Sequence, residues 1–428
     1  MQRPLTTRDT AAFFIPLVLW AQLMMITHSV IHGWLARQPD PTVSLAGFAV
    51  AFALNGLFNS AFRSLHQVVL GYSDQRGSFH RVALGASALA VVNMAVVLAL
   101  AHTVLGDWVY GGMMGAGPAV VAEARAASSI LALIFPLQML RNLAIGLLMA
   151  RRRTTFITAG TAVRLMALWG FLVGWSFWVE GARLGAAALV SCIGLETLFI
   201  VGCAWPVWRR MGVGSQPAGY GSILRFALPL MLNSALENAM VVLVNIVLGR
   251  LQQADLALAA FGVARGLLML MTTPLRNLAQ TAQALAHSAE DVMIVRRFAL
   301  GATLVFVAII GVLFYSPLQG WVLSDVLGLG EELREAVVPG VLLFALAPFC
   351  WSAASLYRGL LAGARRTGVL AFTGFARVAA VSTVALAGLA WPGVNGAALG
   401  VAALIAGFGT EALLLRHRYL GLGRSALK

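Results

Sequence analysis

Long apolar stretches alternate with short polar or Gly/Pro-rich stretches along all 428 residues of the chain. Most apolar stretches reach or exceed ~20 residues, the length that an α-helix needs to cross the hydrocarbon core of a bilayer. Division at charged and Gly/Pro clusters predicts twelve transmembrane helices. They lie at residues 13–35, 43–70, 82–104, 126–150, 156–179, 184–207, 226–249, 256–285, 298–323, 336–362, 368–391 and 397–415. The pattern therefore predicts an all-α integral membrane protein.

Composition supports this fold class. The chain is 60% hydrophobic and 11% charged, whereas a soluble domain has about 25% charged residues. The first apolar segment, at 13–35, is too long for the core of a signal peptide and has no small-residue cleavage site after it, so we interpret it as a retained helix. Cys192, Cys203 and Cys350 lie in apolar segments without disulfide or metal-site spacing, which favours a packing role.

Basic residues are distributed unevenly among the predicted loops. The two termini and the even-numbered loops hold 18 Arg and Lys residues, whereas the odd-numbered loops hold 5. The positive-inside rule then predicts that both termini are cytoplasmic, in a plasma or bacterial inner membrane. The acidic loop at 325–335 falls outside, as this orientation requires. Membrane topology thus accounts for the net charge of +14, and we expect no nucleic-acid partner.

The chain contains an internal repeat with an offset of about 213 residues, since FFIPLVL at 13–19 returns as FALPLML at 226–232. The predicted parts are an N-lobe at 1–208, a cytoplasmic linker at 209–225 and a C-lobe at 226–428. Each lobe contains six predicted helices, an even number, so both lobes have the same orientation. A substrate site is then expected between the two pseudo-symmetric lobes, near the bilayer midplane.

Charged residues interrupt the predicted helices, and most of them are basic. An arginine at the bilayer centre costs about 2.5–3.5 kcal/mol on insertion scales, so such residues should face the protein interior or a wet cavity. The seven arginines are Arg63, Arg141, Arg164, Arg265, Arg276, Arg358 and Arg377, and the three acids are Glu196, Glu237 and Glu411. This excess of positive charge indicates an anionic substrate.

Several of these charges have structural interpretations. The predicted structural ion pairs, one in each lobe, are Arg164 with Glu196 and Arg377 with Glu411. Arg141 and Arg358 lie near the cytoplasmic ends of their helices, where long side chains can snorkel to the interface. Arg265 lies near the outer end of its helix and either snorkels in the same way or joins a substrate site.

Arg63 and Arg276 are symmetry mates and the strongest candidates for substrate binding. On a continuous helix, each shares a face with polar residues three or four positions away. These neighbours are Asn59, His66 and Gln67 for Arg63, and Thr272 and Gln280 for Arg276. Pro274 loosens the second helix and frees backbone groups. Guanidinium groups bind phosphate or carboxylate oxygens in a bidentate manner, so we expect an anion site. A structural role, with both arginines bonding backbone carbonyls, is the alternative.

Helix 226–249 adds Glu237 and Asn238 to the candidate site. We interpret Glu237 either as a proton-coupling carboxylate or as the partner of Arg276 or Arg265. His28 and His32 share a helix face, but no third ligand is close in sequence, so a polar lining or packing role is favoured over zinc. The sequence predicts no metal and no other cofactor.

Two lobes of six helices resemble the MATE-like architecture of the multidrug/oligosaccharidyl-lipid/polysaccharide (MOP) exporter superfamily. The second half resembles the progressive ankylosis (ANK) family within it, and the first half is similar mainly at 72–84. The resembling stretches are 228–251 with Pro229 and Asn245, 325–349, 368–381 with Arg377, and 393–415 with Glu411. This resemblance implies export of polyanions such as inorganic pyrophosphate, nucleoside triphosphate or citrate.

The leading hypothesis is a monomeric, alternating-access transporter that exports a small polyanion across the bilayer through a central cationic cavity. The anion's own gradient, or coupling to H⁺ or Na⁺, would drive it. The alternatives are a flippase for an anionic lipid-linked sugar or diphosphate lipid, and a cation-coupled multidrug exporter, which would require acidic residues that are scarce here. The sequence has no Walker motif, nucleophile–base pair or metal cluster, so no enzymatic activity is predicted.

Overall fold

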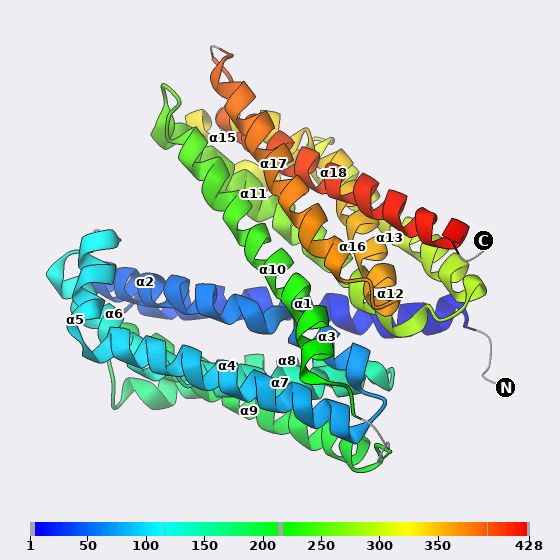
Figure 1. Ribbon diagram of the computed structural model, residues 1–428. Helices are drawn as coiled ribbons and strands as arrows, with labels where there is room; N and C mark the ends of the chain where they lie inside the picture. The colour runs from blue at the N-terminus through cyan, green and yellow to red at the C-terminus, as the bar shows by residue number, and fades with distance from the viewer. Residues whose placement is uncertain (1–4, 115, 213–216, 392, 426–428) are drawn as a thin grey trace. The chain divides into compact units, whose positions relative to one another are not determined.

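A computed structural model describes residues 5–114, 116–212, 217–391 and 393–425 (Figure 1). Helices account for 86% of the chain, and these ranges contain no β-strand. Within these ranges, eleven helices are long and apolar enough to cross a membrane, or twelve when one bent pair is counted as a single span. The predicted all-α, twelve-helix membrane fold is confirmed.

Spans one to six are formed by α1 (Thr7–Leu35), α2 (Pro41–Asn59) with η1 (Ser60–Ser64) and α3 (Leu65–Tyr72), α4 (Arg76–His102), α6 (Pro118–Leu131) with α7 (Ile134–Ala150), α8 (Thr155–Ser176) and α9 (Gly181–Arg209). Spans seven to twelve are formed by α10 (Tyr220–Leu248), α11 (Ala254–Arg276) with α12 (Leu278–Leu285), α13 (Ala289–Phe314), α15 (Glu331–Val341) with η4 (Phe344–Leu346) and α16 (Ala347–Gly363), α17 (Gly368–Leu389) and α18 (Gly396–Ser425). The short elements α5 (Val104–Gly106), η2 (Asp107–Met113), α14 (Leu318–Gly320) and η3 (Trp321–Val326) lie between spans.

The chain folds as two compact units. One contains Leu19–Ala227, and the other contains the chain up to Val18 together with everything from Leu228 onward. The changes of unit fall inside α1 and α10, within two residues of Pro16 and Pro229. Proline removes a backbone hydrogen bond from a helix interior and loosens it locally. The N-lobe, linker and C-lobe at 1–208, 209–225 and 226–428 remain a prediction from the sequence repeat.

Each unit has its own apolar core. In the first, Phe48, Tyr110 and Leu168 are fully buried. In the second, the core includes Trp351 and Phe408, whose rings stack with centroids 3.8 Å apart. Two separate cores agree with a chain that repeats one six-helix pattern twice.

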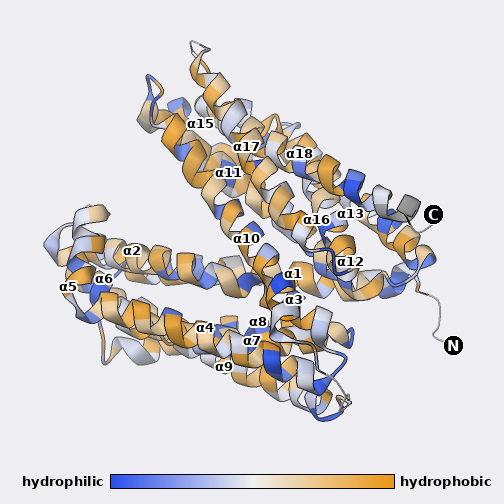
Figure 2. Ribbon diagram, viewed as in Figure 1, coloured by the Kyte–Doolittle hydropathy of each residue, from blue (hydrophilic) through white to orange (hydrophobic). Residues whose placement is uncertain are grey.

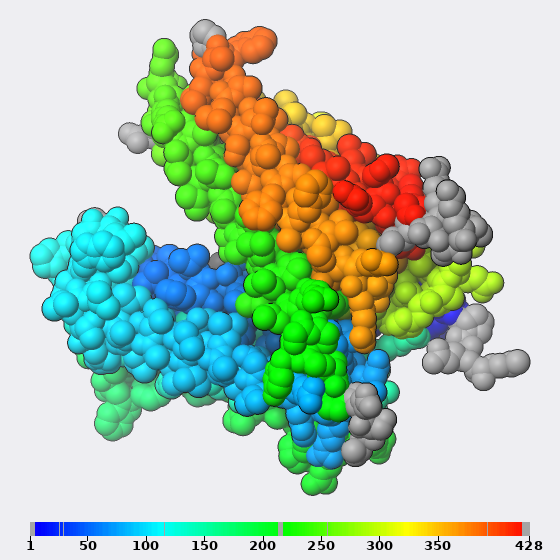
Figure 3. All heavy atoms as spheres, in the orientation of Figure 1, coloured from blue at the N-terminus to red at the C-terminus, as the bar shows by residue number. Residues whose placement is uncertain are grey.

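The outer faces of the long helices are also apolar. Leu84 on α4 and Phe372 on α17 are more than half exposed, and side chains of these two helices cover the faces of their units that point toward the viewer (Figure 3). Hydrophobic residues predominate along most long helices (Figure 2). In water such surfaces would mark interaction or aggregation sites, whereas in a bilayer they are the ordinary lipid-facing surface.

Four of the predicted helices are interrupted. The span predicted at 43–70 passes through the 3₁₀-helix η1 at Ser60–Ser64, and the span predicted at 256–285 breaks at Asn277. The span at 126–150 bends by 40° between α6 and α7, and the span at 336–362 is interrupted between α15 and α16. The interruptions occur at matching positions of the two repeats, so they belong to the duplicated architecture.

Glycines let the segments after these breaks pack closely. A Cβ on Gly146 of α7 would lie 2.5 Å from the Val69 side chain on α3. A Cβ on Gly359 of α16, its repeat mate, would lie 2.2 Å from the carbonyl oxygen of Ala279 on α12. Helices α3 and α12 are therefore held against α7 and α16 at distances that only glycine permits.

Candidate functional site

Arg63 lies on η1, where the second span leaves α-helical geometry. Such a break within a membrane span must have its free backbone groups satisfied by other polar groups. Asn142 Nδ2 donates to the carbonyl oxygen of Phe62 at 3.1 Å, and Asn55 Nδ2 donates to the carbonyl oxygen of Leu131 at 3.1 Å, at the break between α6 and α7. Buried amide side chains thus satisfy backbone oxygens at both breaks of the first unit.

The Arg63 side chain is exposed and forms no ion pair with any residue in the described ranges. The polar stripe expected around it is divided, because His66 and Gln67 are 5% and 8% exposed and lie inside the unit. A 3₁₀-helix has 3.0 residues per turn, whereas an α-helix has 3.6. This difference rotates Arg63 away from the face predicted for a continuous α-helix. Asn59 is half-buried, and its Oδ1 has no hydrogen-bond partner among the residues with described positions.

Arg276 lies at the matching break, at the end of α11, and it has a partner. Its guanidinium forms an ion pair with the Glu237 carboxylate on α10, and the two side chains are 32% and 15% exposed. The sequence allows two interpretations of Glu237, either as a proton-coupling carboxylate or as the partner of Arg276 or Arg265. The structure contains the ion pair with Arg276. The next residue, Asn277, donates from Nδ2 to the carbonyl oxygen of Leu17 at 2.9 Å.

The other predicted site residues of the second half lie on α10, α11 and α12. Asn238 and Gln280 are half-buried, and Arg265 is half-buried without an ion pair to any residue that the structure describes. Thr272 is buried and donates its hydroxyl to the carbonyl oxygen of Leu268 at 2.8 Å. Thr272 is therefore committed to its own helix.

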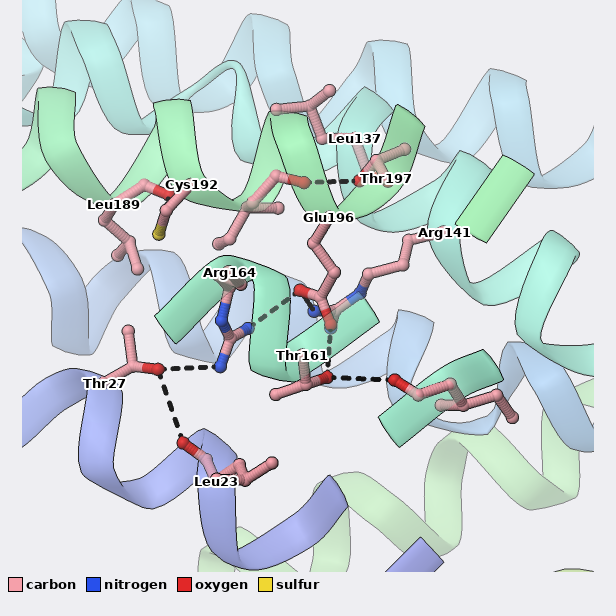
Figure 4. A network of polar contacts seen from close by, with 12 residues as sticks. Leu23, Thr27, Leu137, Arg141, Thr161, Arg164, Leu189, Cys192, Glu196 and Thr197 are labelled. Atoms are coloured by element: carbon pink, nitrogen blue, oxygen red, sulfur yellow. Dashed lines mark hydrogen bonds and ion pairs between the residues drawn. The ribbon is translucent and has the colours of Figure 1, made fainter. Parts of the chain in front are cut away.

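A second type of site is the buried charge cluster of the first unit, which Figure 4 shows. The Glu196 carboxylate accepts hydrogen bonds from Arg141 at 2.7 Å, from Arg164 at 3.0 Å and from the Thr161 hydroxyl at 2.6 Å. Arg164 also donates to the hydroxyl of Thr27 on α1 at 2.9 Å. Four helices, α1, α7, α8 and α9, are thereby joined through one carboxylate.

The second unit repeats this cluster. The Glu411 carboxylate accepts from Arg358 at 2.9 Å and from Arg377 at 2.6 Å. Arg377 also donates to the backbone oxygen of Asn233 at 3.0 Å and to its side-chain oxygen at 3.3 Å. A Cβ on Gly374 would lie 2.9 Å from that side-chain oxygen, so the glycine makes room for the contact.

The interpretation of Arg141 and Arg358 as snorkelling side chains was wrong. Both are buried, with 3% and 8% of their surface exposed, and each binds the glutamate of its unit. They are 217 positions apart rather than 213, so each lies one helical turn from the repeat position of the other. An alignment at the fixed offset therefore does not pair Arg141 with Arg358. The sequence does carry one signal: with three acids for seven arginines in the spans, a buried carboxylate has to be shared by more than one arginine if each is to have a partner.

Each cluster contains two guanidinium groups and one carboxylate, so it is cationic when all three groups are ionised. Glu196, Glu411 and Arg377 are fully buried, and Arg164 is 2% exposed. Within the described residues, the Nε atoms of all four arginines lack hydrogen-bond partners. Each cluster therefore joins helices of its unit around one carboxylate that two guanidinium groups share.

The described residues contain no group of three His, Cys, Asp or Glu side chains that could hold a metal ion. His28 packs against Phe52 with ring centroids 4.7 Å apart, and His32 packs edge-on against Phe48 at 5.7 Å. Cys192 is a buried free thiol. These contacts are typical of packed side chains.

Comparisons with known proteins identify the fold. A transporter of the MOP superfamily from Pyrococcus furiosus is 16% identical over 97% of this chain and 96% of its own, with a TM-score of 0.74; its binding pocket is described as having reverse polarity that suggests a different function. A MATE structure in a straight conformation is 16% identical over 98% and 97% of the two chains, with a TM-score of 0.73. The eukaryotic MATE transporter AtDTX14 is 13% identical over 97% and 95%, with a TM-score of 0.70. This chain has the MATE fold.

No family model matches the sequence. No curated protein matches it either. The similarity to solved structures therefore concerns the fold, along nearly the whole chain.

Proposed function

We propose that this protein is an alternating-access transporter that exports a small polyanion of the pyrophosphate, nucleoside triphosphate or citrate class. The observation that carries the proposal is Arg63, an exposed guanidinium at a break in a membrane span, without an ion-pair partner among the described residues. The ANK-like stretches of the second half support the same substrate class.

The balance of charge within the spans favours an anion. The predicted spans contain seven arginines and three glutamates, an excess of four positive charges. Arg276 is neutralised by Glu237, each buried cluster has one more guanidinium than carboxylates, and Arg63 and Arg265 account for the remainder. In surroundings of low dielectric constant, this excess attracts an anion strongly and repels a cationic substrate.

The chemistry of Arg63 fits phosphate and carboxylate. The planar guanidinium donates two parallel hydrogen bonds to such groups, and it stays ionised at all physiological pH values. The Oδ1 of Asn59, which lacks a partner among the described residues, can accept a hydrogen bond from a hydroxyl of the substrate. The Pyrococcus furiosus transporter, with its reverse pocket polarity, is a precedent for different charge patterns on this fold.

Transport of radiolabelled pyrophosphate, ATP and citrate into proteoliposomes tests the proposal. The variants Arg63→Ala and Arg63→Lys separate loss of charge from loss of the bidentate fork, and Arg37→Ala removes an exposed arginine elsewhere in the same half as a control. We expect transport to be reduced strongly in Arg63→Ala, reduced less in Arg63→Lys and unchanged in Arg37→Ala. Undiminished transport in Arg63→Ala would exclude Arg63 from the site.

Cation-coupled multidrug export is the second candidate, and two observations favour it. MATE transporters share the fold, and Glu237 is a partly exposed carboxylate inside a span that could carry a coupling H⁺ or Na⁺. Efflux of an organic cation from the same proteoliposomes, with no uptake of the three anions, would establish this alternative. Movement of a prenyl diphosphate between leaflets without transport of any soluble anion would instead indicate a flippase.

A further inference from the structure

A cavity of about 500 Å³ opens between α13 and α16 in the second unit. Its volume is within the usual range for small-molecule sites. Two consecutive arginines, Arg296 and Arg297, line one end, and Leu300, Phe349 and Ala353 line the walls. The cavity therefore combines a doubly charged end with an apolar interior.

The charged end is available to a ligand. Both arginines are exposed, and neither forms an ion pair with any side chain whose position is described. They lie two turns from the beginning of α13, at positions that the sequence pattern assigns to a loop and that the positive-inside rule predicts to be cytoplasmic. Anionic lipids are enriched in that leaflet, and basic pockets between transmembrane helices there bind lipid headgroups.

The apolar end continues into the lipid-facing surface. Leu300 and Phe349 are 56% and 44% exposed, and Leu304, one turn further along α13, is also exposed. The inner wall is closed by the buried hydrogen bond from Thr303 to the Ser352 hydroxyl, 2.7 Å long. Because Thr303 lies seven residues from Arg296, the cavity extends roughly 10 Å along the helix axis, from interface depth into the hydrocarbon region.

The first half does not repeat the chemistry of this cavity. The repeat positions of Ala353 and Tyr357 hold Leu140 and Ala144. HRVALGAS at 80–87 aligns with RRFALGAT at 296–303, so the counterpart of Arg297 is Arg81. Arg81 donates to the backbone oxygens of Pro217 and Ala218 at 3.2 and 2.9 Å. In the second half Ala353 leaves space at the position where the first half has Leu140. The linker backbone binds Arg81, whereas no hydrogen bond to the linker holds Arg296 or Arg297 among the described residues.

The geometry points to a binding site for an anionic phospholipid between α13 and α16. The headgroup phosphate lies on Arg296 and Arg297, and one acyl chain runs past Leu300, Phe349 and Ala353. An acyl chain matches the apolar wall, which a free phosphate ion would leave exposed. The site is distinct from the candidate transport site at Arg63 and does not depend on what is transported.

Native mass spectrometry of the full chain with added phosphatidylglycerol tests the proposal, with phosphatidylcholine of the same acyl chains and inorganic phosphate as comparisons. We expect phosphatidylglycerol to bind at least about tenfold more tightly than phosphatidylcholine, because each arginine near the surface contributes about one kcal/mol. Inorganic phosphate should not displace the lipid. Equal binding of the two lipids, or displacement by phosphate, would overturn the assignment.

Two variants locate the site. Arg296→Gln/Arg297→Gln removes the charges, and Ala353→Phe fills the cavity while keeping both arginines; each should reduce phosphatidylglycerol binding to the phosphatidylcholine level. The control Arg151→Gln/Arg153→Gln removes two exposed arginines from another loop and should leave binding unchanged. Wild-type binding by the first double variant, whose exposed positions tolerate glutamine, would refute the site even if Ala353→Phe fails to fold.

Discussion

The two halves of the protein share the same helical scaffold and differ at the arginine beside the break in their second span. Both contain a buried glutamate between two arginines, and both interrupt a membrane span beside an arginine. In the first half that arginine, Arg63, is exposed and has no ion-pair partner among the described residues. In the second half Arg276 is bound by Glu237. The buried clusters are equivalent, whereas the breaks carry different charge.

The difference arises from one position of the helix that begins each half. Glu237 on α10 corresponds, at the repeat offset, to Met24 on α1. An apolar residue at that position provides no counter-charge for the arginine of the first half. Each half thus has an arginine at a helix break. The halves differ at the position of Glu237 and Met24, where the second half has an acidic residue and the first half has an apolar one. A permanent cation in one half and a protonatable pair in the other can perform different tasks, anion binding and coupling.

The largest expected effect concerns the feature that the halves share. Glu411→Gln leaves Arg358 and Arg377 buried without a counter-charge, and breaking a buried pair in this way typically costs about 3–5 kcal/mol. Thermal unfolding of the purified protein, followed by tryptophan fluorescence, should show a large decrease in Tm. Glu196→Gln should be milder, because the hydroxyl of Thr161 can still hydrogen-bond the amide.

A charge-neutralising variant is the control for this prediction. Arg358→Met leaves one guanidinium beside one carboxylate, so the cluster becomes neutral while its position stays filled. We expect its Tm to fall much less than that of Glu411→Gln. An equal fall in both variants would mean that packing, rather than charge, determines the stability of the cluster.

The next effect concerns the difference between the halves. Arg63→Ala should reduce anion transport by about 10- to 100-fold, since hydrogen bonds to a charged group contribute about 1.5–3 kcal/mol. Arg276→Ala should also reduce transport, but for another reason, because it leaves Glu237 unpaired and negative. Initial uptake rates in proteoliposomes measure both losses.

The double variant Arg276→Gln/Glu237→Gln separates the two reasons. It keeps the site neutral without an ion pair, so part of the activity lost in Arg276→Ala should return if the pair is not essential for coupling. A double variant as inactive as Arg276→Ala, with Arg63 intact, would show that the pair itself takes part in transport. Full activity of Arg276→Ala alone would remove the proposed asymmetry in charge.

The sequence predicted most of the scaffold and less of the site. Twelve apolar segments predict twelve spans because each crossing of a bilayer requires about 20 predominantly apolar residues. The described residues contain eleven helices of this kind, or twelve when one bent pair is counted as a single span, although four of the spans are interrupted. The predicted partners Arg164 and Glu196 are in contact. The sequence pattern places Arg141 at the interface, whereas the structure places it on Glu196. That contact depends on how α7 packs on α9, and a local hydrophobic pattern does not encode this register.

The helix breaks illustrate the same limit. Pro274 indicated the weak point of the span at 256–285, since proline lacks a backbone donor. No proline indicates the matching break at Ser60–Ser64, which is stabilised from outside by Asn142 on α7. Because Asn142 is far from this break in the chain, its hydrogen bond to the Phe62 carbonyl oxygen leaves no signal in the sequence around Ser60–Ser64. The face on which Arg63 lies could therefore not be predicted.

A smaller effect is expected at the glycines that pack the breaks. Gly359→Ala would place a methyl group 2.2 Å from the backbone oxygen of Ala279, and overpacking of this kind costs about 1–3 kcal/mol. Gly146→Ala meets mainly the side chain of Val69 and lies 3.0 Å from the oxygen of His66, so it should cost less. Tm values of the two variants test this order, and the reverse order would mean that the first half is the more tightly packed at its break.

The smallest effect is expected near the ends of the spans, around α6 in the first half and α15 in the second, where the halves use different ion pairs. Arg125 binds Asp107 at 2.7 Å and also donates to the backbone oxygen of Ala101 at 3.0 Å, so it ties η2 to α4 and α6. Arg334 contacts Glu331 within its own helix at 3.6 Å, and that glutamate is highly exposed. Exposed pairs contribute about 0.2–1 kcal/mol, so Asp107→Asn should lower the Tm slightly and Glu331→Gln should not change it. Because salt screens such pairs, the difference between the variants should shrink in high salt, whereas a difference that persists there would be due to the hydrogen-bond geometry around Arg125.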